Sequence, residues 1–376
     1  MRQLIVIIDA LGWLTAERLE VLAGELPFRR RLTTVFGYSS TAIPSLLTGA
    51  APSEHGHWFL YKRALDRRPF ALAGWIDRLP GNPGRRWRVR MRLQEFWRRR
   101  AGISGYFSLY DVPLRVLADL APVEIEDTWA PHAFPDTPSI VDVLATGGRS
   151  YHVSDWRVPD AEKIRRAEAA LDAGEPEVVL LYLTEVDAAQ HRYGTRHEAF
   201  ETKVRDTAAA VKRVWARMQR NGPVGLSVAS DHGMTDVRDH RDVLGHLEKA
   251  GLRRGRDFDG FFDSTVARFW NIRDLPGLRE ALDALPGGRV LDPGTLEEWG
   301  VRFPRGEYGD VFFLVDPGVL ILPSDMGSTA IAAMHGYDPA HPTSDACFLA
   351  DRELPLRSEH LTAVFPLWKR RIEDGI

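Results

Sequence analysis

The feature that most constrains the fold is a set of three short, largely apolar runs separated by long helical patterns. They cover Leu4–Ile8, Val178–Leu183 and Gly225–Ala229. Runs of this length that are rich in β-branched side chains are typical of strands buried on both faces of a parallel sheet. Because such strands alternate with helices here, the sequence predicts a doubly wound, mainly parallel α/β sheet with helices on both faces.

Three further elements are expected around these runs. A helix follows the first run as far as about Ala23, a second strand covers Leu32–Phe36, and a long helix covers Glu198–Arg220. The second strand would lead into a short apolar helix that begins near Ser39.

Acidic side chains stand just beyond the carboxyl ends of the three runs. They are Asp9, Asp187 and Asp231, and the ligands of doubly wound sheets gather at this edge. Asp187 and His191 are four residues apart, which places both on one face of a helical turn where they can bind one ion. Asp231 and His232 are adjacent at a strand end, where the chain can turn both side chains inward. The same pair also fits a simple capping turn.

A further histidine, His335, precedes Gly336 in a predicted loop. A lone histidine in such a loop is ordinarily a surface residue, but beside the Asp and His pairs it becomes a candidate metal ligand.

Hydrolysis of a phosphate ester is one reaction that such a set of ligands could serve, because it needs charge neutralisation, an activated nucleophile and a stabilised leaving oxygen. Two closely spaced divalent cations supply all three.

The stretch Gly37–Gly56 carries two adjacent hydroxyls, Ser39 and Ser40, just ahead of its helix. A serine in this place is first of all an N-cap, because its oxygen accepts a bond from an unpaired helical N–H. It is alternatively a nucleophile, since the N–H groups and the helix dipole stabilise an anion there. The stretch by itself leaves both readings open.

Composition narrows the class of protein. The net charge of −3 over 376 residues argues against a nucleic-acid binder. The single cysteine, Cys347, excludes an internal disulfide framework and a thiolate-only metal site. The first apolar run is too short for a signal peptide core or a membrane span, so we expect a cytoplasmic protein without a membrane span.

Two segments interrupt the alternation of strands and helices. Residues 58–135 are rich in Arg and Trp, and residues 240–326 have the pattern of a small α+β unit. We therefore expect a metal-binding core formed by residues 1–57, 136–239 and 327–376, with the two segments as insertions that form a cap.

Arginine dominates the part of the first insertion from Arg85 to Arg100, which contains eight Arg and one Glu. Such charge runs are usually solvated helices. The alternative is an anion-collecting cap over the site.

Five motifs follow one another along the expected core. They are Asp9, the Ser39 to Gly56 stretch with Thr-Gly-x-x-Pro-x-x-His-Gly, Asp187-x-x-x-His191-x-x-Gly194, Ser230-Asp231-His232-Gly233 and His335-Gly336-Tyr337-Asp338. In this order the set resembles the alkaline phosphatase superfamily, and it is most similar to the type I phosphodiesterase/nucleotide pyrophosphatase family. The resemblance implies an alkaline phosphatase-like core and leaves both insertions unmatched.

The resemblance also implies two zinc ions, with manganese as the alternative metal. One ion would be bound by Asp187, His191 and His335, and the other by Asp9, Asp231 and His232. The oxygen of the nucleophile would lie between the two ions.

The register of the family motif selects that nucleophile. In the family it lies nine residues before the Thr of the Thr-Gly pair, so counting back from Thr48 implies Ser39, with Ser40 as runner-up and a substrate-binding candidate. Leu60 stands where family pyrophosphatases carry an Asn that contacts the phosphoryl oxygen. The candidates to replace this Asn are His57, Tyr61 and Lys62.

We therefore predict a two-zinc hydrolase that cleaves phosphodiester or pyrophosphate bonds of a small-molecule phosphate ester or diphosphate through a phosphoserine. A phosphomonoesterase on the same core is the main alternative. A metal-dependent phosphomutase and a non-catalytic binding protein are the others. Cys347 does not stand where a sulfatase would carry its formylglycine nucleophile.

Overall fold

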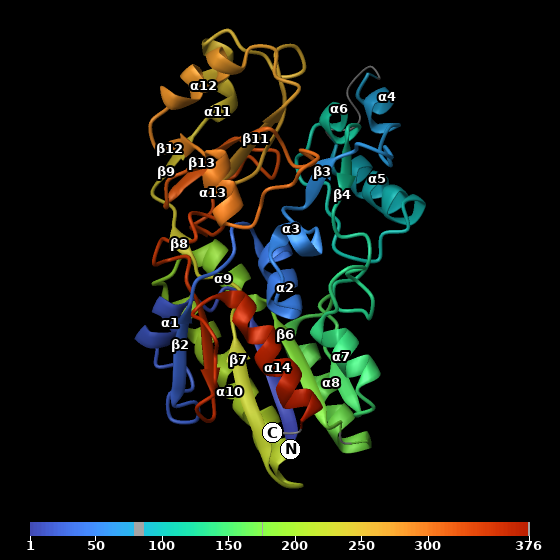
Figure 1. The fold of residues 1–376 in the computed structure, drawn as a ribbon, viewed down its shortest axis with the longest axis vertical. Coiled ribbons are helices and arrows are strands. Elements are labelled where there is room, and N and C mark those ends of the chain that lie inside the picture. Colours follow the sequence, from blue (N-terminus) through green and yellow to red (C-terminus); the bar gives the residue numbers. More distant parts are fainter. Residues whose placement is uncertain (79–85, 175, 375–376) are drawn as a thin grey trace. The chain divides into compact units, whose positions relative to one another are not determined.

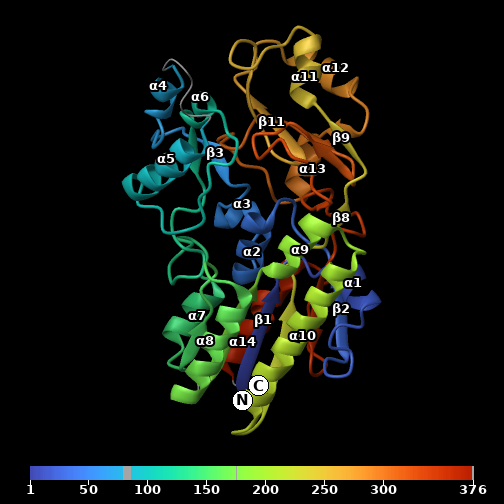
Figure 2. The ribbon, with the colours of Figure 1, turned by 180° about the vertical axis from the view of Figure 1, so that it is seen from behind.

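The structure is a computed structural model that describes residues 1–78, 86–174 and 176–374 (Figures 1 and 2). These residues form two compact units. The first comprises Met1–His55, Trp129–Asp236 and Ile331–Ile376, and the second comprises Gly56–Thr128 and Val237–Ala330. Both expected insertions fall in the second unit, except that residues 129–135 belong to the first. Whether the insertions form a cap stays a prediction.

The first unit is organised around a six-stranded sheet with the strand order β2-β16-β7-β1-β6-β5. The strands are β1 (Arg2–Ile8), β2 (Phe28–Leu32), β5 (Tyr151–Val153), β6 (Val178–Leu183), β7 (Val224–Ala229) and β16 (Ala346–Ala350). β1 pairs in parallel with β6 and β7, and β5 pairs in parallel with β6. Only β16 runs antiparallel to its neighbours β7 and β2. The sheet is thus mainly parallel, as predicted.

Helices cover both faces of this sheet. The helices of this unit are α1 (Trp13–Arg18), α2 (Ser39–Thr48), α3 (Pro52–His55), α7 (Ile140–Thr146), α8 (Asp160–Ala173), α9 (Glu185–Tyr193), α10 (Glu198–Gln219) and α14 (Val364–Glu373), and all but α3 contribute to the two clusters that cover the sheet. Side chains of α1, α8, α9 and α10 pack in one hydrophobic cluster, and those of α2, α7 and α14 pack in another. Figure 2 shows α8 and α10 in front of β1. Because strand side chains alternate, Leu4, Val6 and Ile8 of β1 enter the first cluster, whereas Ile5 and Ile7 enter the second.

Two expected elements differ from the structure near the N-terminus. The first helix ends at Arg18 rather than near Ala23, and Glu20 and Leu22 adopt positive φ angles that interrupt it. The second strand covers Phe28–Leu32 rather than Leu32–Phe36. It is the edge strand of the sheet, so three consecutive arginines are accommodated between two buried ends.

The second unit contains a four-stranded antiparallel sheet, β10-β11-β13-β12, and two small strand pairs. Its strands are β3 (Tyr61–Arg63), β4 (Leu120–Pro122), β9 (Asp239–Arg241), β10 (Asp259–Phe262), β11 (Val266–Trp270), β12 (Gly288–Val290), β13 (Val311–Val315) and β14 (Val319–Ile321). Its helices are α4 (Ala73–Asp77), α5 (Trp87–Arg100), α6 (Leu114–Leu117), α11 (Val243–Lys249), α12 (Leu275–Asp283) and α13 (Pro293–Glu298). Phe70 and Trp97 share one hydrophobic cluster with Phe261 and Trp270, so the two insertions have a common core.

Among the described residues, every helix is too short or too polar to cross a lipid bilayer.

Candidate active site

The carboxyl ends of three neighbouring strands in the first unit bring three aspartates together. Asp9 follows β1, Asp187 lies in the first turn of α9 after β6, and Asp231 comes two residues after β7. Since β6, β1 and β7 are adjacent and parallel, these ends meet at one edge of the sheet. We call Asp9, Asp187 and Asp231 the acidic cluster.

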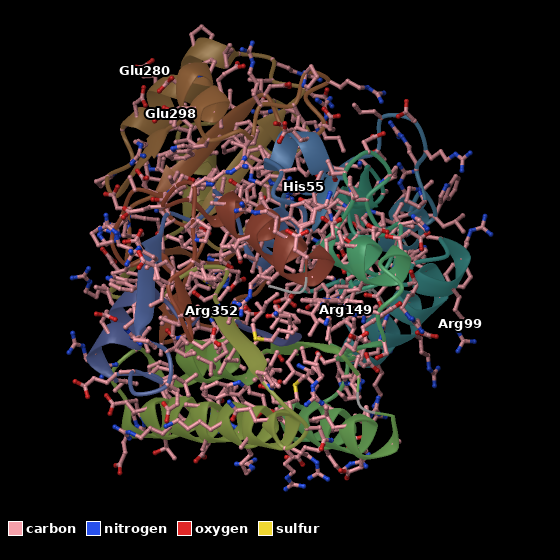
Figure 3. All side chains as sticks on the ribbon, turned by 60° about the horizontal axis from the view of Figure 1, so that its bottom comes forward. His55, Arg99, Arg149, Glu280, Glu298 and Arg352 are labelled. Atoms are coloured by element: carbon pink, nitrogen blue, oxygen red, sulfur yellow. The ribbon has the colours of Figure 1, made fainter. Side chains whose placement is uncertain are left out.

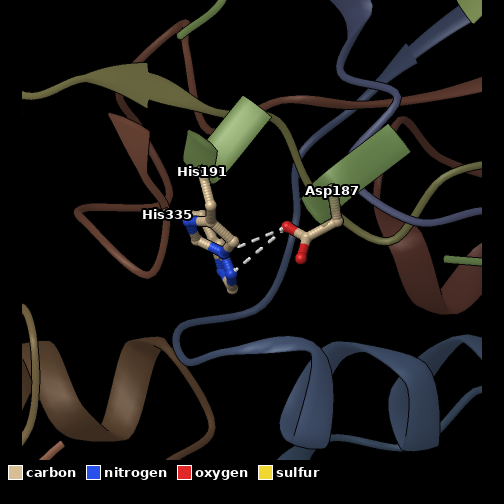
Figure 4. A group of neighbouring side chains, drawn as sticks. All are labelled: Asp187, His191 and His335. Carbon is tan, nitrogen blue, oxygen red and sulfur yellow. Dashed lines mark ion pairs between the residues drawn. The ribbon is translucent and has the colours of Figure 1, made fainter. Parts of the chain in front are cut away.

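One candidate metal group consists of Asp187, His191 and His335 (Figure 4). The Nε2 atoms of His191 and His335 lie 3.3 Å and 3.7 Å from Oδ1 of Asp187. Nδ1 of His191 is 2.8 Å from the carbonyl oxygen of Ala333. Because a carbonyl only accepts, Nδ1 donates to it, so Nε2, which faces Asp187, is the nitrogen that could bind a metal.

A second candidate group consists of Asp9, Asp187 and His232. Nε2 of His232 lies 3.1 Å from Oδ2 of Asp231 and 3.7 Å from Oδ1 of Asp9. Its Nδ1 donates to the carbonyl oxygen of Gly233 at 2.9 Å. Asp187 therefore belongs to both groups, while Asp231 contacts the second through His232.

The two serines at the start of α2 have different environments. Ser39 is the first residue of the helix, whereas the N-cap is Tyr38, which makes no side-chain capping bond. The hydroxyl of Ser39 donates to Oδ1 of Asp9 at 3.4 Å and lies 2.9 Å from Nε2 of His232. The hydroxyl of Ser40 is buried without a hydrogen-bond partner among the described residues. Ser39 is thus the hydroxyl that joins the acidic cluster, and the N-cap reading of this serine is wrong.

The other predicted substrate-binding residues belong to the second unit. Tyr61 is buried in its hydrophobic cluster, and its hydroxyl donates to the carbonyl oxygen of Ser108. Lys62 is half-buried on β3, and burial lowers the pKa of His57 to about 4. Their roles, and that of Ser40, stay predictions.

Burial and mutual repulsion dominate the electrostatics of the acidic cluster. Burial, followed by the charges of Asp231 and Asp187, raises the pKa of Asp9 well above its ordinary value. Burial also raises the pKa of Asp231. Burial and the neighbouring His232 and His191 lower the pKa of His335, so this histidine is neutral, the form that binds metals.

The donor atoms of this site fit divalent cations. Oδ1 of Asp187 and Oδ2 of Asp231 are buried without a hydrogen-bond partner among the described residues. The described part of the chain offers these carboxylates ion pairs with histidines only. Burying several carboxylates without a cation is costly, and oxygen and imidazole ligands suit zinc or manganese.

Sequence reasoning missed Tyr182, which supports Asp9. Tyr182 is the fifth residue of β6, and its hydroxyl donates to Oδ2 of Asp9. Trp129 stacks on its ring with the centroids 4.6 Å apart. The one available signal is a hydroxyl-bearing side chain near the end of an otherwise aliphatic strand.

A second missed residue, Gln190, stabilises the turn after β1. Its side-chain amide donates to the carbonyl oxygen of Ala10 at 2.8 Å, and the N–H of Ala10 donates to Oδ1 of Asp231 at 3.1 Å. Ala10 has φ of 57°, which is unfavourable for a residue with a Cβ. The two bonds therefore hold a strained turn that aims Asp9 at the cluster.

Comparisons with known proteins agree with this geometry. A sequence model of the family described as type I phosphodiesterase / nucleotide pyrophosphatase matches residues 5–338. No curated protein matches the chain.

Solved structures share the fold. Murine ectonucleotide pyrophosphatase/phosphodiesterase 5 has a TM-score of 0.68 at 16% identity, covering 99% of this chain and 95% of that one. An inactive variant of the murine protein in complex with AMP has a TM-score of 0.67 at 16% identity, covering 100% and 95%. The human protein has a TM-score of 0.67 at 15% identity, covering 99% and 95%.

Proposed function

The chain belongs to the type I phosphodiesterase/nucleotide pyrophosphatase family and is a hydrolase of phosphoric esters, and from this premise we propose that it cleaves its substrate through a phosphoserine at Ser39. The substrate would be a small molecule with a phosphodiester or pyrophosphate bond. A nucleotide-containing diester or diphosphate fits this description, since cleavage of such a molecule can release AMP, and a protein of the same fold has been solved with AMP.

The position of Ser39 carries this proposal. Its oxygen lies at the first turn of α2, and the start of a helix favours negative charge such as that on a phosphoryl group. Its hydroxyl lies 3.4 Å from Oδ1 of Asp9 and 2.9 Å from Nε2 of His232. Both contacts orient the serine toward a substrate bound over the acidic cluster.

The reaction would take place in two displacements. In the first, a bond forms between the Ser39 oxygen and phosphorus, the bond to the leaving oxygen breaks, and the serine proton is released. In the second, water attacks the phosphoserine, the Ser39 oxygen leaves, and it regains a proton. Asp9 and His232 lie beside this oxygen, which fixes the place of Ser39 relative to the expected metal ligands.

Six side chains would hold the metal ions that this chemistry needs. Following the expected assignment, they are Asp187, His191 and His335 for one ion and Asp9, Asp231 and His232 for the other. Five of the six belong to the two candidate groups, and Asp231 adjoins the second group through His232. Two zinc ions bound there would neutralise phosphoryl charge, lower the pKa of the nucleophile and stabilise the leaving oxygen. Manganese is the alternative metal.

The test is to identify the phosphorylated residue and to compare two serine variants. Ser39→Ala should lower kcat by about three orders of magnitude while the metal content stays the same, since all six Asp and His ligands remain. Ser40→Ala is the matched control, with a loss on the order of tenfold. Phosphate trapped at low pH should be found on the Ser39 peptide by mass spectrometry. Phosphate on Ser40, or an active Ser39→Ala enzyme, would refute the mechanism.

A kinetic comparison of two substrates separates the diesterase from the monoesterase alternative. An aryl phosphodiester should be hydrolysed with a higher kcat/KM than the matching monoester. A tenfold preference for the monoester, about 1.4 kcal/mol in transition-state terms, would replace the diesterase assignment.

A further inference from the structure

We propose that the outer face of α5 is a docking surface for an anionic lipid bilayer. This helix, Trp87–Arg100, contains six arginines and one glutamate. It belongs to the second unit, and Arg85, the first residue of the predicted basic run, lies outside the described residues. The inference concerns a surface that the proposed hydrolysis does not use.

The inner face of α5 is fixed to its own unit. Trp97 is fully buried in the hydrophobic cluster of the unit, and Leu93 packs against the same cluster. Arg90 donates to the carbonyl oxygens of Leu109 and Tyr110 at 3.0 Å and 2.9 Å. The helix is therefore held in place, and its opposite face is preformed.

Arginines line the centre of that opposite face. At roughly 100° per residue, Arg88, Arg92 and Arg99 fall on one narrow stripe opposite Trp97, and all three are exposed. Figure 3 shows Arg99 projecting away from the ribbon. Like charges four residues apart, as at Arg88 and Arg92, destabilise a helix in water. A negatively charged partner would reverse this cost.

The charge of this stripe is poorly compensated within the chain. Glu95 is the one acid of the helix, and it pairs with Arg98 and Arg99. Arg88 and Arg92 form no ion pair with any described residue. A surface of this sign therefore fits an extended anionic partner.

Large apolar side chains flank the arginines. Trp87 is 69% exposed and Met91 is 52% exposed, and they are four residues apart on one edge of the stripe. Phe96, which is 48% exposed, lies on the other edge. Trp and Phe beside basic residues are typical of helices that lie in the interface of a membrane. A nucleic acid would use the arginines and aromatic rings, but Met91 offers a base no stacking plane.

The experiment is co-sedimentation of the full chain with lipid vesicles. The protein should bind vesicles that contain one third phosphatidylglycerol and not vesicles of phosphatidylcholine alone, and high salt should weaken the binding. The triple variant Arg88→Glu, Arg92→Glu, Arg99→Glu should bind the anionic vesicles about a hundredfold more weakly or worse. The control triple variant Arg205→Glu, Arg213→Glu, Arg220→Glu changes exposed arginines of α10 and of its C-cap, makes the same change in net charge and should bind as the wild type.

Two further variants separate a membrane from other polyanions. Trp87→Ser with Met91→Ser should weaken vesicle binding on the order of tenfold, because apolar insertion is lost while the charge is kept. The triple variant Arg88→Gln, Arg92→Gln, Arg99→Gln removes the charge without reversing it and should also weaken vesicle binding, which decides the case if the glutamate variant fails to fold.

Several outcomes would overturn the proposal. They are no binding to anionic vesicles at low salt, an equal loss in the α10 control, and wild-type binding by the serine variant. Displacement of the protein from vesicles by a single-stranded oligonucleotide that it binds more tightly would assign the surface to nucleic acid instead.

Discussion

Two groups of buried charged side chains, one in each unit, are built on opposite plans. In the acidic cluster of the first unit, Asp9, Asp187 and Asp231 lie near histidines but without an arginine or lysine partner among the described residues. In the second unit, Arg254 pairs with Asp325 through two hydrogen bonds of 2.9 Å and 2.6 Å.

The second unit repeats this pairing at Arg268, which donates to Asp263 at 2.7 Å with both side chains 1% exposed. Buried charges that neutralise each other hold strands and loops in place. Buried charges of one sign that leave oxygen atoms unpartnered need a cation from outside the chain. Burial of charged side chains alone therefore does not mark a functional site, whereas a buried set of charges of one sign does.

Replacing one Asp by Asn in each group should affect activity in the acidic cluster and stability in the second unit. The larger effect is expected in the acidic cluster. Asp231→Asn keeps an oxygen to accept from the N–H groups of Ala10 and His232 but removes the charge. We expect kcat/KM to fall by about three orders of magnitude as metal is lost. Elemental analysis should show less zinc, while urea unfolding of the metal-free protein should show no loss of stability. A variant with full metal content and rate would contradict the proposed site.

Asp325→Asn should have its effect on stability instead. It leaves the buried guanidinium of Arg254 without its counter-charge, which should lower the free energy of unfolding by about 3 kcal/mol. Urea denaturation measures this change, and elemental analysis should show an unchanged metal content. Replacing Arg254 by Met in the same chain should recover part of the loss. Loss of metal in Asp325→Asn would contradict a purely structural role for the Arg254–Asp325 pair.

Tyr182→Phe tests whether the hydrogen bond from Tyr182 to Asp9 helps the acidic cluster to bind metal. The variant keeps the ring that stacks on Trp129 but loses the hydrogen bond to Asp9. We expect metal affinity to fall by about tenfold, measured by competition with a chelator of known affinity. If the affinity is unchanged, the hydrogen bond does not orient Asp9 for metal binding.

The smallest expected effect belongs to Glu124, an acid of the second unit that has no cationic partner among the described residues. Burial raises the pKa of Glu124 to about 7, above its ordinary value of 4.5. Because the folded-state pKa is raised, the stabilisation is present below about pH 4.5 and is lost as the pH rises through 7.

The loss should be on the order of 1 kcal/mol, since the side chain is only half-buried. Glu124→Gln should be free of it. Urea unfolding of both proteins at a series of pH values measures the difference. Parallel stability curves for the two proteins would show that Glu124 does not titrate with folding.

Central strands and long helices were predictable from the sequence. β6 coincides with the predicted Val178–Leu183, and α10 ends one residue before the predicted Arg220. β6 is apolar throughout because both of its faces are buried, and α10 has a regular apolar stripe because one of its faces packs on the core. The sequence placed β2 wrongly because an edge strand can have only its ends buried. Its three central arginines therefore do not form the apolar run by which a strand is recognised.

The sequence by itself determined which residues could form the site. The spacing of Asp187 and His191 is a local property of a helix, and the position of acids after apolar runs follows from strand ends. The local pattern left Ser39 and Ser40 open, and only the family register implied Ser39. The tertiary structure adds that α2 directs the hydroxyl of Ser39, and not that of Ser40, to Asp9 and His232. It also decided that Tyr182 and Gln190 support Asp9 and its turn, and that the two insertions share one core. These contacts join residues that are far apart in the chain, so a local sequence pattern does not predict them.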